Sequence, residues 1–594
     1  MENENQYYNQ VKTEAETTLN KKNRIIRHFY IYRLLAFILI FPGFWLFKHN
    51  LLLSAISATI FLTVFLWLIR KNLELERKKR KLEIRLFLIN REVKALQHDY
   101  LTFPEGNEFI DPQHPYSYDL DIFGKGSLFQ YINRTTTDGG SQFLAQWLTR
   151  SEKDKESILQ RQQSVKEISR FREWRLNFLT EGNLIDVSGQ EKSALIETNQ
   201  EHIHIKNQKF LKAIVIVIPI LTLATLLIFI FTGTHIWLTL TLIINFAILY
   251  IYRKEIDLYY ILFGNKTQLI KKYLNILRII ENQKFESKEL NRLQQSILKP
   301  VKSSESIAVL MKAMAQLEYR ANMVVGVLLN LFLMWDLRCV LKLKKWHNEN
   351  SENLKKWTET TEIFDAIISL GIYADHNPDY TFPTPLHENF IFTAKNLGHP
   401  LIKPEKRIDN DFNIESFPKV TIITGANMAG KSTFLRAIGV NMVLASAGVP
   451  VCSIGMVFTP VDIYTSIRTT DSLLKAESYF LAELKRIATI MGKLRNNIPM
   501  MVILDEMLKG TNSEDKLKGS QQLVHQLART KAATIIATHD VKLTEIEQQL
   551  PDVVSNFCFE ITHQGDEIIF DYKLRPGVTT TMNASLLMKK LGII

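Results

Sequence analysis

The sequence predicts a multidomain chain with transmembrane helical hairpins, a mainly α-helical region and a C-terminal α/β domain. Three observations lead to this fold class. Two pairs of long apolar runs interrupt the chain, helical periodicity dominates from 127 to 212 and from 253 to 374, and short β-rich runs alternate with helical stretches beyond about residue 418. A length of 594 residues is enough for several domains and a large hydrophobic core.

Composition narrows the class of protein further. Apolar residues make up 46% of the chain, which excludes a wholly disordered protein. Its three cysteines (Cys339, Cys452 and Cys558) lie far apart without a C-x-x-C pair, so we expect no zinc site, no disulfide framework and a reducing compartment. The chain carries 73 Lys and Arg against 61 Asp and Glu, a net charge of +12.

The apolar runs predict two transmembrane hairpins, at 34–70 and at 213–252. A spanning helix needs about 20 apolar residues, and three of the runs approach that length. Four buried core helices are the alternative, but two closely spaced hydrophobic hairpins are costly to hide in a soluble protein. The runs are Leu34–Phe47, which contains Pro42 and Gly43, then Leu51–Ile69, Ala213–Phe231 and Ile236–Tyr252.

The basic residues flank the first hairpin on both outer sides. Residues 21–33 hold five Lys or Arg and no acid, and residues 70–91 hold nine against three Glu, whereas the loop Thr232–His235 of the second hairpin has none. The positive-inside rule therefore predicts a multi-pass protein of a bacterial cytoplasmic (inner) membrane, with both termini in the cytoplasm. The basic excess indicates contact with an anionic membrane surface before it indicates DNA.

The expected domain organisation follows from these boundaries. Residues 1–20 are polar and we expect them to be mobile. Val324–Trp335 is a further apolar run, too short to span a membrane and closely preceded by charges, so we expect a buried core helix there. Prolines between 378 and 404 mark the approach to the last domain. The predicted segments are a basic N-terminus (1–33), the first hairpin (34–70), a basic helix and linker (71–116), a first helical part (117–212), the second hairpin (213–252), a second helical part (253–397) and the α/β domain (398–594).

A glycine-rich loop in the last domain has the spacing of a phosphate-binding motif. Gly425–Ser432 reads G-x-x-x-x-G-K-S (Walker A), with the strand candidate Lys419–Thr424 before it and a helical pattern after it. Backbone N–H groups of such a loop and the following helix N-terminus bind phosphate oxygens. We expect Lys431 to reach the β and γ phosphates and Ser432 to bind Mg²⁺. The expected nucleotide-binding residues are Gly425, Asn427, Met428, Gly430, Lys431, Ser432 and Thr433.

Two further strand ends complete the pattern. Met500–Glu506 reads as a buried parallel strand that ends in two carboxylates, of which Asp505 would hold Mg²⁺ and Glu506 would orient the attacking water. His539 follows the next strand candidate, 534–538, and could sense the γ-phosphate, although an isolated histidine is more often a solvated loop residue. Phosphoryl transfer needs anion ligands, a metal and an oriented water, so the sequence predicts ATP hydrolysis with Glu506, His539 and Lys431 as catalytic residues.

These motifs resemble those of the MutS family of DNA mismatch-repair ATPases. Thr424–Thr433 is close to the family's T-G-P-N-M-G-G-K-S-T and departs from it at Ala426 and Ala429. Leu504–Ser513 is similar to L-D-E-I-G-R-G-T-S-T, and Asp471–Glu483 to the S-T-F-x-x-E signature. Ser478 takes the signature serine position, with Glu477 where an arginine is common. Tyr572–Gly577 resembles a C-terminal family motif.

The resemblance covers roughly 117–594 and is dense over 398–580. It implies a MutS-like core and lever in the two helical parts and a P-loop (ABC-type) ATPase domain in 398–594. The family's mismatch reader is an N-terminal domain with a Phe-x-Glu wedge. The apolar hairpin and basic helix occupy that space here, and the two matching triplets, at 103–105 and 171–173, are attributed to chance. No clamp segment is identified in the sequence.

The resemblance further implies a homodimer in which Ser478 completes the partner's nucleotide site in trans. ATP binding and hydrolysis would switch a helical lever or clamp on DNA, mismatched or structured. The alternative is a DNA-independent membrane mechanochemical ATPase that acts on a protein partner or on its own hairpins. A transporter half is a third reading, disfavoured because the apolar runs carry no intramembrane charge and no L-S-G-G-Q signature is present.

Overall fold

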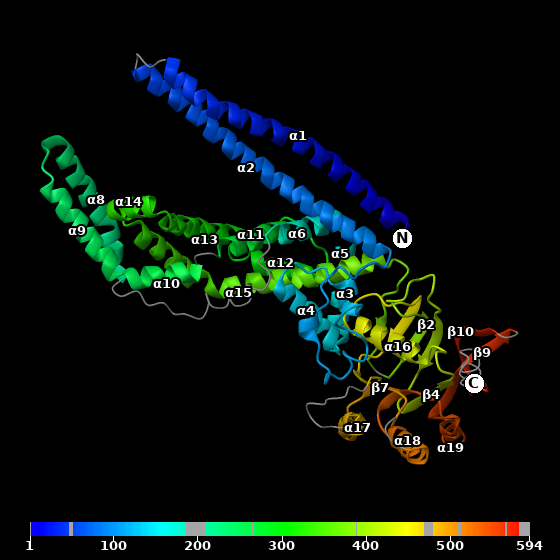
Figure 1. Cartoon of the computed structure of the whole chain (residues 1–594). Coiled ribbons are helices and arrows are strands. Elements are labelled where there is room, and N and C mark those ends of the chain that lie inside the picture. Colours follow the sequence, from blue (N-terminus) through cyan, green and yellow to red (C-terminus); the bar gives the residue numbers. More distant parts are fainter. Residues whose placement is uncertain are drawn as a thin grey trace.

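The computed structural model describes residues 2–46, 51–185, 208–263, 266–387, 389–468, 479–508, 512–564 and 567–580. The chain is a mostly helical multidomain protein with an α/β sheet region at its C-terminal end (Figure 1). Ser478 and Glu477 lie outside the described residues, as do residues 47–50.

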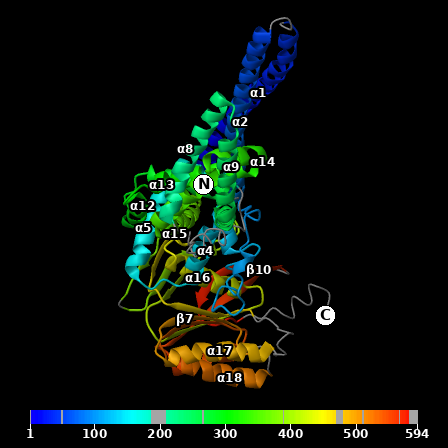
Figure 2. The same cartoon turned by 90° about the vertical axis from the view of Figure 1, so that its left-hand side faces the viewer.

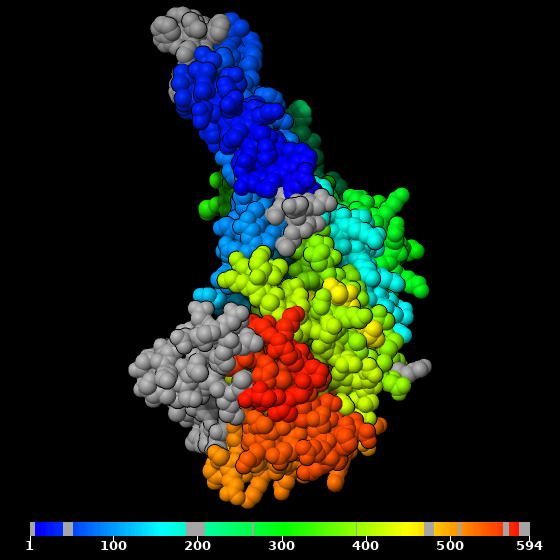
Figure 3. Space-filling model, turned by 90° about the vertical axis from the view of Figure 1, so that its right-hand side faces the viewer, coloured from blue at the N-terminus to red at the C-terminus, as the bar shows by residue number. Residues whose placement is uncertain are grey.

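Two long antiparallel helices form the N-terminal part, α1 (Glu2–Leu46) and α2 (Leu51–Leu96). At 1.5 Å per residue, each is about 68 Å long. Residues 1–20 were expected to be mobile, and this expectation is wrong because α1 begins at Glu2 and buries Tyr8 and Ala15. These two side chains are seven residues apart and so share the face that packs against the rest of the molecule. Figure 3 shows this pair of helices at the opposite end of the molecule from the sheet region.

The far end of this hairpin is apolar on its surface. Exposed side chains there come from both helices: Ile31, Leu34, Leu35, Phe37, Ile38 and Leu39 of α1, and Leu52, Leu53, Ile56, Ile60, Leu62, Val64, Leu66 and Trp67 of α2. The near end of α2 is held on the helical region by ion pairs from Lys81 to Glu181 (2.6 Å) and from Arg85 to Glu173 (2.6 Å).

A second apolar hairpin consists of α8 (Gln208–Thr232) and α9 (Ile236–Ile251), and α10 (Arg253–Phe263) follows it after a 60° bend. Among the described residues, Leu52–Leu96 and Gln208–Thr232 are long and apolar enough to cross a membrane. The number rises to four if α9 with α10, and α14 with α15, each count as one bent span.

The run Val324–Trp335 does not form a core helix, so that prediction is wrong. It forms α14 (Met323–Leu333), in which only Gly326 is buried. Met334 then adopts a left-handed conformation (φ 50°), and α15 (Trp335–His376) leaves at an angle of 81°. The bend carries α14 away from the helical region and sets it beside α8 and α9 (Figure 1).

The helical region is built around α15, a helix of 42 residues. Its second half is almost continuously buried, including Phe364 and Asp365. The fully buried Arg175 pairs with Asp375 near its end. The surrounding helices are α3 (Leu128–Ile132), α4 (Asp138–Thr149), α5 (Lys155–Arg170), α6 (Arg172–Leu184), α11 (Thr267–Glu281), α12 (Lys288–Leu298) and α13 (Ser303–Leu317), with short 3₁₀ turns η1 (Asn107–Phe109) and η2 (Glu318–Ala321).

The C-terminal region contains a six-stranded sheet in the order β10-β9-β4-β8-β7-β6. All neighbours are parallel except β9 and β10, and β4, β7 and β8 are buried on both faces, as expected for a parallel sheet. Its strands are β4 (Lys419–Gly425), β6 (Asp462–Ser466), β7 (Met500–Asp505), β8 (Ala532–Ala537), β9 (Val554–Gln564) and β10 (Glu567–Pro576).

The described residues of this region also form a smaller sheet and five helical segments. The smaller sheet has the order β1-β5-β2-β3, from Thr384–Pro385, Gly455–Phe458, Phe392–Leu397 and Asn410–Ile414. The helical segments are α16 (Lys431–Ser446), α17 (Tyr479–Arg495), α18 (Ser513–Leu527), η4 (Val541–Glu545) and α19 (Ile546–Gln549). Figure 2 shows α17 and α18 side by side at the end remote from the apolar hairpins.

The buried Asp119 joins the helical region to the sheet. Its carboxylate accepts hydrogen bonds from Thr465 Oγ1 (2.7 Å) and from the backbone N–H groups of Ile467 and Arg468 (both 3.1 Å), and it pairs with Arg486 (3.1 Å). A buried carboxylate with this many donors fixes the segment it sits on. Asp119 therefore links the segment before α3 to the end of β6 and to Arg486.

Candidate functional site

The loop between β4 and α16 requires glycine at two positions. Gly425 has φ 153°, and a Cβ there would lie 2.8 Å from the backbone oxygen of Phe559. Gly430 has φ 103°, and its Cβ would lie 3.0 Å from the ring of Tyr572. Both conformations are strained for residues with a side chain. Helix α16 begins at Lys431, so its first backbone N–H groups face the loop.

Lys431 is buried under this loop. Its Nζ donates to the backbone oxygens of Gly425 (2.7 Å) and Ala426 (2.9 Å). Burial lowers the pKa of the Lys431 amine to about 8, against the opposing pull of the Asp505 and Glu506 carboxylates. Burial disfavours the charged form of the amine in the empty site, and an anion bound beside it would favour that form.

Asp505 and Glu506 lie at the carboxyl end of β7. Glu506 Oε1 is 2.8 Å from Nε2 of His539, which follows β8. The parallel register pairs Asp505 with Ala537 of β8, and the Glu506 N–H donates to the Ala537 oxygen (2.9 Å). Glu506 has φ 54°, an uncommon conformation for a non-glycine residue, and such strain is concentrated at functional sites.

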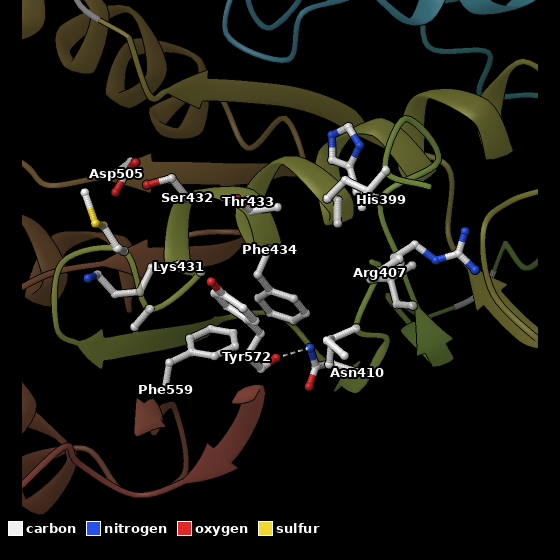
Figure 4. Close-up of a pocket in the computed structure, with 18 of the residues that line it drawn as sticks. His399, Arg407, Asn410, Lys431, Ser432, Thr433, Phe434, Asp505, Phe559 and Tyr572 are labelled. Carbon is white, nitrogen blue, oxygen red and sulfur yellow. Dashed lines mark hydrogen bonds between the residues drawn. The ribbon is translucent and has the colours of Figure 1, made fainter. Parts of the chain in front are cut away.

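These groups share one cavity of about 590 Å³. Figure 4 shows Asp505, Ser432 and Lys431 toward one end, and Arg407 and His399 toward the other, with the rings of Phe434, Phe559 and Tyr572 between them. The size and the mixture of polar and aromatic lining suit a small organic anion. Burial and two nearby arginines lower the pKa of His399 to about 4, so this ring is neutral at physiological pH.

Most of the predicted site residues line this cavity. They are Asn427, Met428, Gly430, Lys431, Ser432, Thr433, Asp505, Glu506 and His539. Gly425 contributes to the site through its backbone oxygen, which accepts a hydrogen bond from Lys431 Nζ. Ser478 is among the residues that the structure does not describe, so its predicted role in trans stays a prediction.

Sequence reasoning assigned no site role to Tyr572, Asn410 or Arg407, which also line the cavity. Asn410 Nδ2 donates to the backbone oxygen of Tyr572 (3.0 Å), and the Leu574 N–H donates to Asn410 Oδ1 (2.8 Å), so β3 holds the irregular stretch of β10 between Phe570 and Leu574. The C-terminal motif around Tyr572 was recognisable in the sequence, but its position over Gly430 was not.

Glu483 holds the turn that follows Asp505 and Glu506. It lies in α17, is buried, and its Oε1 accepts a hydrogen bond from the Leu508 N–H (2.6 Å) just after the two carboxylates. Leu508 has φ 59°, so this contact holds an unusual turn. In the sequence, Glu483 is the last residue of the segment similar to the S-T-F-x-x-E signature.

Comparison with known proteins adds an independent line of evidence. A family model described as MutS domain V matches residues 421–587, and one described as MutS domain III matches residues 115–188. Relatives called DNA mismatch repair protein MutS include those of Lachnoclostridium phytofermentans (31% identity over 39% of this chain and 25% of the relative), Thermotoga maritima (29%, 43% and 31%) and Caldanaerobacter subterraneus (32%, 36% and 25%).

The chain spans about a quarter to a third of the length of these curated relatives. The domain V match includes most of β4, all of β7 and β8, and the cavity residues from Asn427 onward, and the domain III match includes the segment of Asp119 that joins the helical region to the sheet. The matched segments, the motif residues at one cavity and the mostly helical architecture agree, and together they support a MutS-family protein.

Proposed function

We propose that this chain is a membrane-anchored MutS-like ATPase. It binds and hydrolyses ATP with Mg²⁺ in a composite site of a homodimer, and it uses the cycle to switch a helical lever or clamp on DNA, mismatched or structured. One observation carries the proposal: Lys431, Asp505 and the Glu506–His539 pair converge on one cavity beside a loop that only glycine can form at two positions.

The loop and Lys431 would bind the phosphates. Backbone N–H groups at the start of α16 point at an anion site, and the helix dipole favours negative charge there. Lys431 would exchange the Gly425 and Ala426 oxygens for the β and γ phosphate oxygens.

The residues present fit a Mg²⁺ ion that is held jointly with the nucleotide. In the described part of the chain, no three or more His, Cys, Asp or Glu side chains are grouped so that they could hold a metal alone. Mg²⁺ commonly takes one or two protein oxygens together with phosphate oxygens and water. Ser432 and Asp505 line the same cavity and would supply those oxygens; the ion would neutralise phosphate charge during transfer.

Glu506 would orient and polarise the attacking water. Its contact with His539 at 2.8 Å limits the positions that the carboxylate can take, and His539 also lies 3.4 Å from Lys431 Nζ. A shift of the γ-phosphate would therefore reach Glu506 through His539, which is the sensing role proposed for this histidine.

The aromatic part of the cavity would hold the base. Tyr572 packs over Gly430, and the edge-to-face pair Phe434 and Phe559 (5.7 Å between ring centres) lies beside it. Planar bases stack favourably on such rings.

DNA belongs to the proposal through the relatives, whose names describe DNA mismatch repair, and the homodimer belongs to it through the family resemblance of the signature segment. Ser478 would complete the partner's nucleotide site in trans. The two apolar hairpins would anchor the chain in the cytoplasmic membrane of a bacterium, because apolar side chains stay exposed along α2, α8 and α9 and the basic residues flank the first hairpin. The domain boundaries given above, with the ATPase domain at 398–594 in the cytoplasm, are part of this proposal.

The test is ATP turnover by the full chain in lipid nanodiscs, with homoduplex, mismatched and branched DNA at two salt concentrations. We expect turnover in the wild type, none in Lys431→Ala, and stimulation by one DNA form that weakens with salt, because phosphate contacts release counterions. Equal turnover in Lys431→Ala would reject the site. If none of the DNA forms changes the turnover rate, only the proposed action on DNA would be rejected.

A second candidate function is supported by a specific contact between α15 of the helical region and α8 of the second apolar hairpin. Pro219 of α8 lacks an N–H, so the Val215 oxygen one turn earlier has no helical donor. Arg338 of α15 donates to that oxygen (3.0 Å). A movement of α15 would therefore act directly on α8, which suits a DNA-independent ATPase that moves its own hairpins or a protein partner. Turnover that depends on the lipid and on Arg338, with no response to DNA, would favour this alternative.

A further inference from the structure

Helix α14 is apolar at every position except Asn330, whose Oδ1 accepts a hydrogen bond from the Asp336 N–H (2.9 Å), yet little of the helix is covered. Its sequence is MVVGVLLNLFL. Met323 is 83% exposed, Val324 69% and Leu328 53%. A helix without a polar face is stable when an apolar environment surrounds it. The protein itself supplies this environment on only part of α14.

One side of α14 is joined to the second hairpin by a buried polar group. Asn245 of α9 is fully buried, and its Nδ2 donates to Thr222 Oγ1 of α8 (3.0 Å) and to the backbone oxygen of Leu331 in α14. Leu331 lies in the last turn of its helix, where carbonyl groups have no helical donor. Asn245 thus caps α14 from another helix, which matters most where water is absent.

The two ends of α14 emerge at the same charged layer. Arg320, just before the helix, pairs with Asp336, just after it (3.4 Å), and also with Asp257 of α10 (2.6 Å). The helix has 11 residues, about 16 Å at 1.5 Å per residue, whereas a bilayer core is about 30 Å thick. The helix is therefore too short to cross, and its ends return to one side.

We propose that α14 inserts into the acyl-chain region of the membrane beside α8 and α9 and returns to the cytoplasmic side without crossing. This inference rests on the membrane anchoring of the proposed function and adds a third intramembrane element at the point where α15 begins. Lipid is the occupant because the exposed face of α14 continues the apolar surface of the second hairpin, for example at Leu223 and Phe246. The base of α15, with Asp336 and Arg338, then lies at the membrane surface.

The experiment places a polarity-sensitive fluorophore at single cysteines in the full chain, reconstituted in phosphatidylcholine vesicles. The native cysteines Cys339, Cys452 and Cys558 are buried, so the introduced thiol is labelled first. Three positions are compared: Val327→Cys in α14, Leu223→Cys in α8, and Ile454→Cys, an exposed apolar residue of the sheet region. Quenching by doxyl-labelled lipid reports acyl chains, and quenching by iodide reports water.

We expect the probes at 327 and 223 to have blue-shifted emission, strong doxyl quenching and weak iodide quenching, with the reverse at 454. If 223 behaves as a lipid position and 327 behaves like 454, the inference about α14 is wrong while the anchoring stands. If 223 and 327 both behave like 454, the anchoring itself fails. Binding of α14 to another protein copy would give protection from both quenchers at 327, and this result would also overturn the inference.

Asn245→Leu tests the cap with volume nearly conserved. In this background the probe at 327 should shift toward water, with a red-shifted emission and more iodide quenching, while the probe at 223 keeps its lipid signature. An unchanged signal at 327 would remove Asn245 from the docking of α14.

Discussion

The buried amine of Lys431 should take up a proton when the nucleotide binds. Its pKa is lowered from 10.5 to about 8 because burial disfavours the charged form in the empty site. A bound phosphate adds further negative charge beside the amine, so the pKa should rise again toward its ordinary value. Above pH 8, binding and protonation of Lys431 are therefore linked.

The size of the effect follows from these two pKa values. At pH 9 the amine is about one-tenth protonated in the empty site and almost fully protonated in the complex, so about 0.9 proton is taken up per nucleotide. At pH 7 the uptake is only about 0.1 proton. Affinity should accordingly fall about tenfold between pH 7 and pH 9.

Isothermal titration calorimetry with MgADP, in buffers that differ in ionisation enthalpy, measures this uptake without turnover. Lys431→Arg is the matched control, because a guanidinium stays charged at pH 9 and should bind without proton uptake. Heats at pH 9 that do not depend on the buffer, or an equal uptake in Lys431→Arg, would refute the reasoning about this amine.

The other predictions concern the residue that orients the attacking water, the ring that stacks on the nucleotide base, and a buried carboxylate in the helical region. Glu506→Gln should retain ATP binding but slow hydrolysis by about 100-fold or more, measured as single-turnover phosphate release; normal turnover would remove Glu506 from catalysis. Tyr572→Ala should weaken nucleotide binding by about 1–3 kcal/mol and Tyr572→Phe should not, measured by fluorescence titration, since stacking needs only the ring; equal affinity of all three proteins would argue against a base over Gly430. Asp365→Ala should lower stability by about 2–5 kcal/mol, because the N–H groups of Thr136 and Thr137 (both 2.8 Å) lose their acceptor. Thermal unfolding in one detergent, with the exposed Asp379→Ala as the control, checks this prediction; matching midpoints for the two variants would contradict it.

The chemistry-bearing part of the site could be predicted because it is local in sequence. Gly425–Ser432 and the Asp505–Glu506 pair each begin at the last residue of a buried strand, and the strands are parallel neighbours of β8. Parallel register brings such strand ends to one edge, so the convergence follows once the strands are recognised. The positive φ of Glu506 and its contact with His539 are properties of the folded turn and leave no pattern in the sequence.

The rest of the cavity could not be predicted because it depends on long-range packing. Tyr572 lies on an antiparallel strand added at the sheet edge, and a bulge in β10 with support from Asn410 turns its ring toward Gly430. These contacts join residues more than 140 positions apart. No local periodicity in the sequence predicts contacts over such a distance along the chain.

The wrong prediction for Val324–Trp335 has a different cause. A short apolar run reads the same in sequence whether a protein core or a lipid surrounds it. The left-handed Met334 and the bend of 81° carry α14 away from the helical region, and neither is visible as a turn motif in the sequence. The polar N-terminal segment was also misjudged, since Tyr8 and Ala15, seven residues apart, place one face of α1 in the hydrophobic core.

The measurement that tests the central claim most directly is ATP turnover by the full chain in lipid nanodiscs, with Glu506→Gln as the background. The account predicts turnover well above that background and stimulation by one form of DNA that weakens as salt rises. Turnover that is equal in the wild type and in Glu506→Gln would contradict the account at its centre, because the cavity would then not be the place of hydrolysis.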